Sequence, residues 1–275
     1  MTKREKRLKK GISSLDKQIE SHNKKKQLAS EIGEEELVNY YGYIQEKSML
    51  ETRLVYGMYP EIVTTVGDEE DRLKSLAESY LYKDILKLDQ VKKSDKLEKL
   101  VQALAWQMGS EVSYNELAQI TLLDSTTVEK YITILERAYI VFRLPSLAKN
   151  LRNELKKSKK IYFWDNGIRN AIINQFKPIG MRNDKGALWE NYLISERKKR
   201  NIIYNKKINS YFWRTKQQQE IDYIEENIDT YDAYEMKWGN NSKKWEPSVT
   251  FKNNYALKQF SLINRDNMEE FLLDK

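Results

Sequence analysis

The chain has 275 residues and a formal net charge of +7, with no cysteine and a single histidine, His22. This composition excludes disulfides, thiolate metal sites, histidine-based catalytic triads and histidine-rich zinc sites. Any general acid or base must therefore be a carboxylate, a lysine, a tyrosine or a metal-bound water.

The excess positive charge lies at the start of the chain. Residues 1–26 hold ten Lys and Arg against three Asp and Glu, and the remaining residues hold 38 of each sign. We expect residues 1–30 to be a basic leader that contacts nucleic-acid phosphates, or else a solvated leader with no partner. No apolar run is long enough to span a membrane and no secretory signal is present, so we expect a cytoplasmic protein without a membrane partner.

Residues 31–92 are predicted to be largely helical. Apolar residues recur at helical spacing over residues 34–56 and again over residues 69–88, and Gly57 and Pro60 interrupt the pattern between them. The second stripe is more typical of a face that packs against a core than of a ligand site.

Residues 93–164 carry the pattern of a winged helix-turn-helix. Three helices are predicted, followed by two β-rich segments; the helices cover residues 95–108, 114–120 and 125–138, and the β-rich segments cover residues 139–144 and 161–164. Thr126 and Glu129 are predicted to form a capping box at the start of the third helix.

A basic loop joins the two β-rich segments. It offers a predicted set of phosphate contacts for nucleic acid, namely Lys149, Arg152, Lys156, Lys157, Lys159 and Lys160. The alternative is a winged helix that binds a protein or another domain, because a fold does not fix a function.

Residues 165–275 are predicted to form an α/β domain. Helices are expected over residues 165–176, 187–200 and 247–257 and from Asn267 onward, with strands over residues 210–214, 220–225, 230–238 and 260–263.

Two neighbouring strands of this domain carry charged side chains that could meet. Asp222 lies on one strand, and Glu235 and Lys237 share one face of the next. If the strands pair, two carboxylates could hold a divalent metal, with the lysine beside it to act on a phosphate or a water. Glu190 borders the buried face of the preceding helix, where a carboxylate needs a partner or a metal, although it could be an ordinary first-turn glutamate.

The set Glu190, Asp222, Glu235 and Lys237 resembles the PD-(D/E)XK nuclease fold in order, type and spacing. Much of the chain also resembles the C-terminal part of a prokaryotic family of AAA-type ATPases, in which a winged helix and a nuclease-like domain of unknown function follow the ATPase module. The phrases that carry this resemblance are Tyr80–Ile85, Gly186–Asn191, Tyr211–Thr215, Glu220–Tyr223 and Tyr234–Trp238.

The resemblance implies a fold and a chemistry. Residues 165–275 would be a restriction-endonuclease-like domain, in which Asp222, Glu235 and Glu190 bind Mg²⁺ while Lys237 and Glu190 serve catalysis. The chain would be a DNA-binding, Mg-dependent deoxyribonuclease. The alternative is a non-catalytic module that binds nucleic acid, a protein partner or a second copy of itself.

One departure from the family matters. No Gly-x-x-x-x-Gly-Lys-Ser/Thr sequence occurs in the chain, so no ATP site and no ATPase activity are expected. Residues 31–92 would then be the remnant of an ATPase lid, in a chain that is either truncated or a natural stand-alone form.

Overall fold

The computed structural model describes residues 49–64, 67–79, 94–148, 159–239 and 245–273. The chain forms two compact units, residues 1–53 and residues 54–275. Of the first unit, the described residues 49–53 are helical. The basic leader, and most of the predicted loop contacts at Lys149, Arg152, Lys156 and Lys157, lie outside the described residues.

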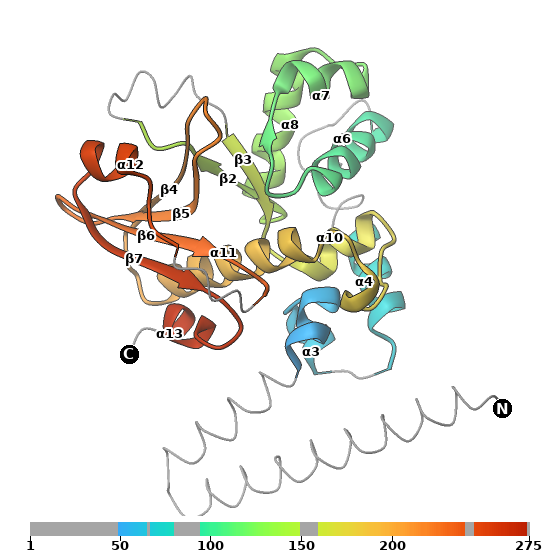
Figure 1. The fold of residues 1–275 in the computed structure, drawn as a ribbon. Helices are drawn as coiled ribbons and strands as arrows, with labels where there is room; N and C mark the ends of the chain where they lie inside the picture. Colours follow the sequence, from blue (N-terminus) through green and yellow to red (C-terminus); the bar gives the residue numbers. More distant parts are fainter. Residues whose placement is uncertain (1–48, 65–66, 80–93, 149–158, 240–244, 274–275) are drawn as a thin grey trace, which may run out of the picture. The chain divides into compact units, whose positions relative to one another are not determined.

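The second unit is mixed α/β, as the sequence predicts, with a helical part followed by a sheet-rich part (Figure 1). The helices of its first part are α3 (Pro60–Val63), α4 (Glu69–Glu78), α6 (Ser94–Trp106), α7 (Tyr114–Thr121), α8 (Ser125–Arg137) and α10 (Asn166–Ile172). None of the helices that the structure describes combines the length and apolar character that a membrane crossing requires.

The start of α8 corrects one local prediction. Asp124, not Thr126, caps this helix: one carboxylate oxygen accepts from the backbone N–H of Thr127 at 2.8 Å, and the other accepts from its hydroxyl at 2.6 Å. An aspartate directly before the first turn is ideally placed to accept a free helical N–H, so the predicted capping box does not form.

A three-stranded sheet follows α8, in the order β1–β3–β2 with both pairs antiparallel. Its strands are β1 (Glu111–Val112), β2 (Val141–Pro145) and β3 (Lys159–Phe163). Because β3 pairs on both sides, the strand extends back to Lys159 and includes residues that the sequence analysis assigned to the basic loop.

The sheet-rich part begins with the short 3-10 helix η2 (Ile179–Met181) and α11 (Lys185–Ile203). The strands β4 (Asn209–Arg214), β5 (Glu220–Glu226), β6 (Tyr231–Met236) and β7 (Leu257–Ile263) form one sheet in sequence order. The first two pairs are antiparallel, and β6 and β7 are parallel. The predicted strands are all present, and their bounds differ by a few residues at most.

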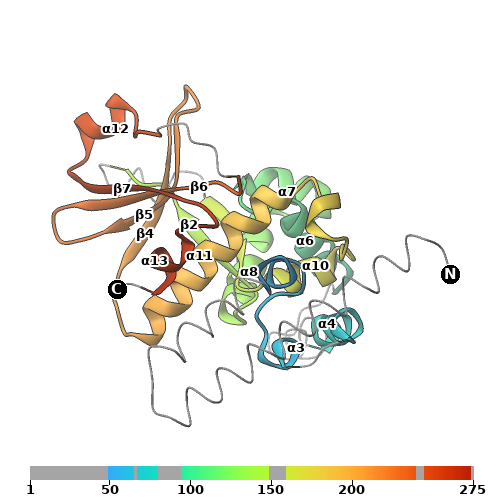
Figure 2. The same ribbon diagram turned by 60° about the horizontal axis from the view of Figure 1, so that its bottom comes forward.

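Helices cover both faces of this sheet (Figure 2). The helix α12 (Val249–Asn254) lies on one face, where Phe251 packs into a cluster with Trp213 and Ile224. On the other face lie α11 and α13 (Met268–Leu273), and the Phe271 ring meets the Tyr223 ring edge-on at 6.2 Å.

A buried ion pair fixes α11 to the sheet. The Arg197 guanidinium donates to both carboxylate oxygens of Glu225, at 2.9 and 2.7 Å, and to the carbonyl oxygen of Phe271 at 2.6 Å. Asn201 and Tyr223 donate to the same glutamate. The charges are therefore paired and their remaining hydrogen-bonding capacity is used, as burial requires.

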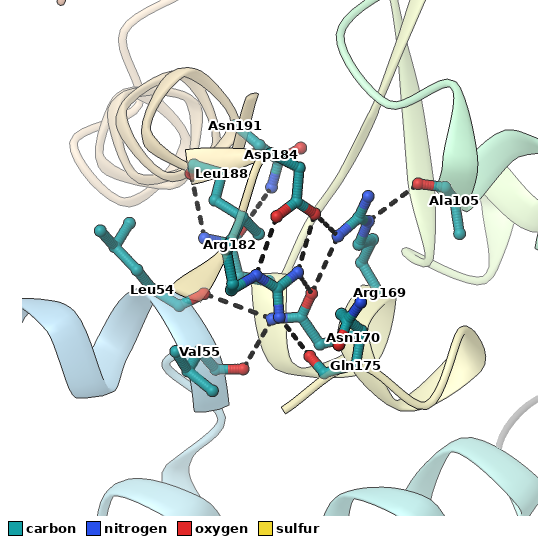
Figure 3. Close-up of polar contacts among 11 residues, drawn as sticks. Leu54, Val55, Ala105, Arg169, Asn170, Gln175, Arg182, Asp184, Leu188 and Asn191 are labelled. Carbon is teal, nitrogen blue, oxygen red and sulfur yellow. Dashed lines mark hydrogen bonds and ion pairs between the residues drawn. The ribbon is translucent and has the colours of Figure 1, made fainter. Parts of the chain in front are cut away.

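A second polar network links α10 to the start of α11 (Figure 3). Asp184 accepts from Arg169 at 2.6 Å and from Arg182 at 2.8 Å, while Asn170 donates to the Val55 carbonyl at 2.7 Å. Burial alone would raise the pKa of Asp184, but hydrogen bonds from Arg182 and Arg169 lower it to about 2. The network therefore keeps Asp184 ionised and fixes the segment that joins the two parts of the unit.

The two sheets also meet directly. The backbone N–H of Leu147, just after β2, donates to the Phe212 carbonyl of β4 at 2.7 Å, and Ser146 forms a parallel bridge with Phe212. This contact brings the three-stranded sheet beside the strands that carry the predicted acidic residues.

Candidate functional site

The pairing of β5 with β6 brings Asp222 and Glu235 together. Tyr223 lies opposite Tyr234 at the end of the paired stretch, and Asp222 and Glu235 are the next residues along the two strands. One carboxylate oxygen of Asp222 accepts from the backbone N–H of Met236 at 2.8 Å. Both acidic residues are buried, with 7% and 5% of their surface exposed. The two carboxyls lie close enough for the charge of Asp222 to act on Glu235.

A bulge in β5 accompanies Asp222. The pairing of β4 with β5 shifts by one residue between Tyr211 and Trp213, so that Asp222 and Tyr223 together face the single residue Phe212. Bulges of this kind turn a side chain away from the regular alternation of a strand and are common beside functional sites.

Lys237 lies directly after β6 and contacts Glu235. Its Nζ is 2.6 Å from a carboxylate oxygen of Glu235 and 4.9 Å from the centre of the Trp245 ring. The lysine side chain is 37% exposed, so its ammonium group can be reached from solvent. The predicted couple of Glu235 and Lys237 therefore exists as an ion pair.

Glu190 lies near Asp222 but already has hydrogen-bond and ion-pair partners. It is on α11, where one of its oxygens accepts from the Tyr162 hydroxyl and lies 3.3 Å from the Lys160 Nζ. The same ammonium is 2.7 Å from a carboxylate oxygen of Glu220. Glu190 thus has two partners from β3.

Lys160 corrects the predicted nucleic-acid surface. It was expected in an exposed basic loop, but it lies in β3 with 4% of its side chain exposed, between two glutamates. Two carboxylates compensate the burial of its charge, so it cannot serve as a surface phosphate contact. Lys159 is partly exposed, and its ammonium lies 5.8 Å from the centre of the Tyr114 ring.

The pKa of each carboxyl in the central pair is raised. Burial is the largest cause for Asp222, followed by the negative charge of Glu190, and together they raise its pKa to about 7 against the opposing Lys160 and Lys237. For Glu235, burial and then the charge of Asp222 raise the pKa to about 7, and Lys237 opposes them. For both carboxyls, burial and a neighbouring negative charge therefore outweigh the lysines beside them.

The lysines of the cluster remain charged. Burial alone would lower the pKa of Lys160, but Glu190 and Glu220 raise it above its ordinary value. Burial also acts to lower the pKa of Lys237, and its hydrogen bond to Glu235 raises it. Both ammonium groups are thus fixed positive charges at neutral pH.

The charge balance of this acidic cluster suits a divalent cation. We define the cluster as the acids Glu190, Glu220, Asp222 and Glu235 with the lysines Lys160 and Lys237. The Arg214 guanidinium also lies 3.8 Å from Glu220, so Lys160 and Arg214 offset the charges of Glu190 and Glu220. Among the described residues, Lys237 is then the one cation in contact with the central pair, which carries one more negative than positive charge when both of its carboxyls are ionised. Oxygen ligands on a buried, negatively charged site are what Mg²⁺ and similar hard cations prefer.

The carboxylates that could share such an ion are Asp222 and Glu235. In the part of the chain that the structure describes, no three acidic or histidine side chains surround one point as a metal centre would require. The predicted trio with Glu190 is therefore not brought together around a common point.

Sequence reasoning missed Tyr162 and Glu220 and misplaced Lys160. The available signal was alternation: Lys160 and Tyr162 stand two residues apart on a strand, so they share a face. That face meets Glu190 only in the folded chain, which a pattern within one segment does not reveal.

Two family models match the chain. Residues 47–178 match "Domain of unknown function (DUF8612)", and residues 185–271 match "Domain of unknown function (DUF4143)". The second match agrees with the predicted resemblance in its coarser form, a module of unknown function such as occurs at the C-terminus of AAA-ATPase-like proteins. The first match ends at residue 178 and the second begins at residue 185, so the border between them lies in the segment that contains Arg182 and Asp184.

Two relatives share part of the sequence. They are uncharacterized proteins of Mycobacterium bovis and Mycobacterium tuberculosis, each 30% identical over 129 residues. The match spans 44% of this chain and 28% of each relative, so the chain corresponds to well under half of their length. No solved structure matches the chain.

Proposed function

We propose that this protein is a DNA-binding, nuclease-like protein in which Asp222 and Glu235 hold a Mg²⁺ ion for phosphodiester cleavage. The observation that carries the proposal is that these two carboxylates are both buried and close enough for the charge of one to act on the other, with a solvent-accessible lysine alongside. The resemblance of the set to the PD-(D/E)XK fold supports the same assignment.

Each residue would have a defined task. Asp222 and Glu235 would supply oxygen ligands, and a bound Mg²⁺ ion would supply Lewis-acid stabilisation of the phosphate. Lys237, partly exposed, would orient the attacking water and stabilise negative charge that develops on the phosphate oxygens. Glu190, which is bonded to Tyr162 and Lys160, would attract the ion through its negative charge without coordinating it directly.

Binding of DNA would involve the part of the chain from α6 to β3. The order of three helices and a pair of antiparallel strands, with β1 between α6 and α7, resembles that of a winged helix-turn-helix and supports this part of the proposal. Positively charged residues of the hairpin loop would then contact phosphates without reading the base sequence.

Plasmid nicking tests the proposal. The full chain should convert supercoiled plasmid to open circles with Mg²⁺ or Mn²⁺ but not with a chelator. Asp222→Asn and Glu235→Gln should each reduce the rate at least about a hundredfold, since each removes a metal-binding charge. The control is Glu270→Gln, at an exposed position on α13. Equal cleavage by the wild type and Asp222→Asn would refute a catalytic role.

A second candidate function is a non-catalytic nucleic-acid-binding module. It is favoured by the internal ion pairs, because Lys237 and Lys160 already neutralise part of the cluster. DNA binding whose affinity falls steeply with salt, without cleavage at any metal concentration, would identify this function.

A further inference from the structure

Lys160 occupies an unusual position for a lysine. Its side chain is 4% exposed, and its Nζ lies 2.7 Å from Glu220 and 3.3 Å from Glu190. The ring of Phe212 lies 5.3 Å from the same ammonium. Transfer of an ammonium group from water into such a site is costly, so its place depends on these carboxylates.

The lysine and its partners come from different parts of the chain. Lys160 and Tyr162 lie on β3, within the region matched by the first family model, and both contact Glu190 on α11. Glu190 and Glu220 lie within the region matched by the second model. The strand β3 thus presents two hydrogen-bond donors to an acidic cluster that belongs mainly to the other region.

We propose that Lys160 is a built-in cation of the acidic cluster, which engages Glu190 and Glu220 and confines a bound divalent cation to Asp222 and Glu235. It acts as a positioning residue, because it determines which carboxylates remain open to an ion. The inference rests on the proposed function in one respect, namely that a divalent cation binds at Asp222 and Glu235.

The arrangement has a measurable consequence. The ammonium of Lys160 repels a divalent cation in the cluster, and its ion pairs occupy two further carboxylates. Substitution by an uncharged side chain of similar length, Lys160→Met, removes the repulsion and the ion pairs with both glutamates, which keep, of their described partners, only Tyr162 at Glu190 and Arg214 at Glu220. The affinity for a divalent cation should therefore rise about tenfold or more, since electrostatic interactions are strong where water is largely excluded.

The test is a calorimetric titration of the full chain with Mn²⁺. The wild type should bind one ion per chain, and Lys160→Met should bind Mn²⁺ about tenfold more tightly. Lys160→Arg keeps the charge and should retain wild-type affinity, which a merely structural role for the side-chain shape would not predict. Circular dichroism and thermal unfolding check that each variant is folded.

Glu220→Gln provides a second variant if Lys160→Met does not fold. Glu220 is 30% exposed, so the substitution should be tolerated. It leaves the Lys160 charge less compensated and should weaken Mn²⁺ binding about threefold or more. Unchanged affinity in this variant would contradict the inference.

The outcomes separate this inference from the proposed function. If the wild type binds Mn²⁺ and Lys160→Met binds it equally or more weakly, the role of Lys160 is refuted and the metal site stands. If only Lys160→Met binds, Lys160 excludes an ion from the native cluster instead of confining it, so this inference and the proposed function both fail. If neither binds, both proposals fail.

Discussion

Asp222 and Glu235 should make the folded chain less stable as the pH rises toward 8. Burial and neighbouring negative charge raise the pKa of both carboxyls to about 7, whereas their ordinary values are 3.8 and 4.5. Between about pH 4 and pH 7 the folded chain therefore holds protons that the unfolded chain has released. The resulting stabilisation is fully present below the ordinary pKa values and is lost as the pH rises through 7.

The magnitude follows from the pKa shift of Asp222. One pKa unit corresponds to about 1.4 kcal/mol, so a rise from 3.8 to about 7 corresponds to about 4 kcal/mol as an upper bound. Because Asp222 and Glu235 raise each other's pKa, the two contributions do not add. We expect Asp222→Asn to remove about 2–3 kcal/mol of the decline in the free energy of unfolding between pH 5 and pH 8, because only about two of the shifted pH units lie within that interval.

Urea denaturation followed by tryptophan fluorescence at several pH values measures this quantity. The difference in free energy of unfolding between Asp222→Asn and the wild type should shift in favour of the variant as the pH rises. Glu270→Gln, at an exposed position, should run parallel to the wild type. Parallel curves for Asp222→Asn would refute the reasoning. Added Mg²⁺ should stabilise the wild type most above pH 7, where the carboxylates are ionised.

Three further substitutions test the framework around the site. Glu225→Gln should cost about 3–5 kcal/mol in urea denaturation, because Arg197 would remain buried without its counter-charge, and a cost below about 1 kcal/mol would contradict this. Asp184→Asn should cost about 1–3 kcal/mol at neutral pH, since two guanidiniums lose their shared carboxylate. That cost should disappear as the pH falls toward 2, which denaturation curves at low pH would show. Gly57→Ala should lower the free energy of unfolding by about 2 kcal/mol or more, because Gly57 has a φ of +76° and a Cβ there would lie 2.1 Å from a carboxylate oxygen of Asp165. Gly186→Ala, where a Cβ meets nothing within 4 Å, is the matched control and should change stability by less than about 1 kcal/mol.

The strands of the second sheet could be predicted because their signal is local. Alternation along Glu220–Glu226 and Tyr231–Met236 places side chains on defined faces, and a short connection favours antiparallel pairing. Once these strands pair, Asp222 and Glu235 must lie close together. This part of the candidate site therefore follows from the sequence.

The partners of Glu190 could not be predicted in the same way. The contacts of Glu190 with Lys160 and Tyr162 join residues about 30 positions apart, through the packing of α11 against β3. A run of lysines is typical of an exposed loop, and its place in a strand can be predicted only when the pairing of that strand is known. The bulge at Asp222 is likewise set by how β4 and β5 pair, which neither strand encodes alone.

The contribution of β3 to the acidic cluster limits how the two halves of this protein can be recombined. A chimera that grafts residues 185–271 onto a foreign partner would leave Glu190 and Glu220 without the donors that Lys160 and Tyr162 provide. Glu190 would then lose both of its described partners, and Glu220 would keep, of its described ion pairs, only the more distant one with Arg214. Residues 185–271 should therefore be transferable to another protein only together with the β3 residues that contact them.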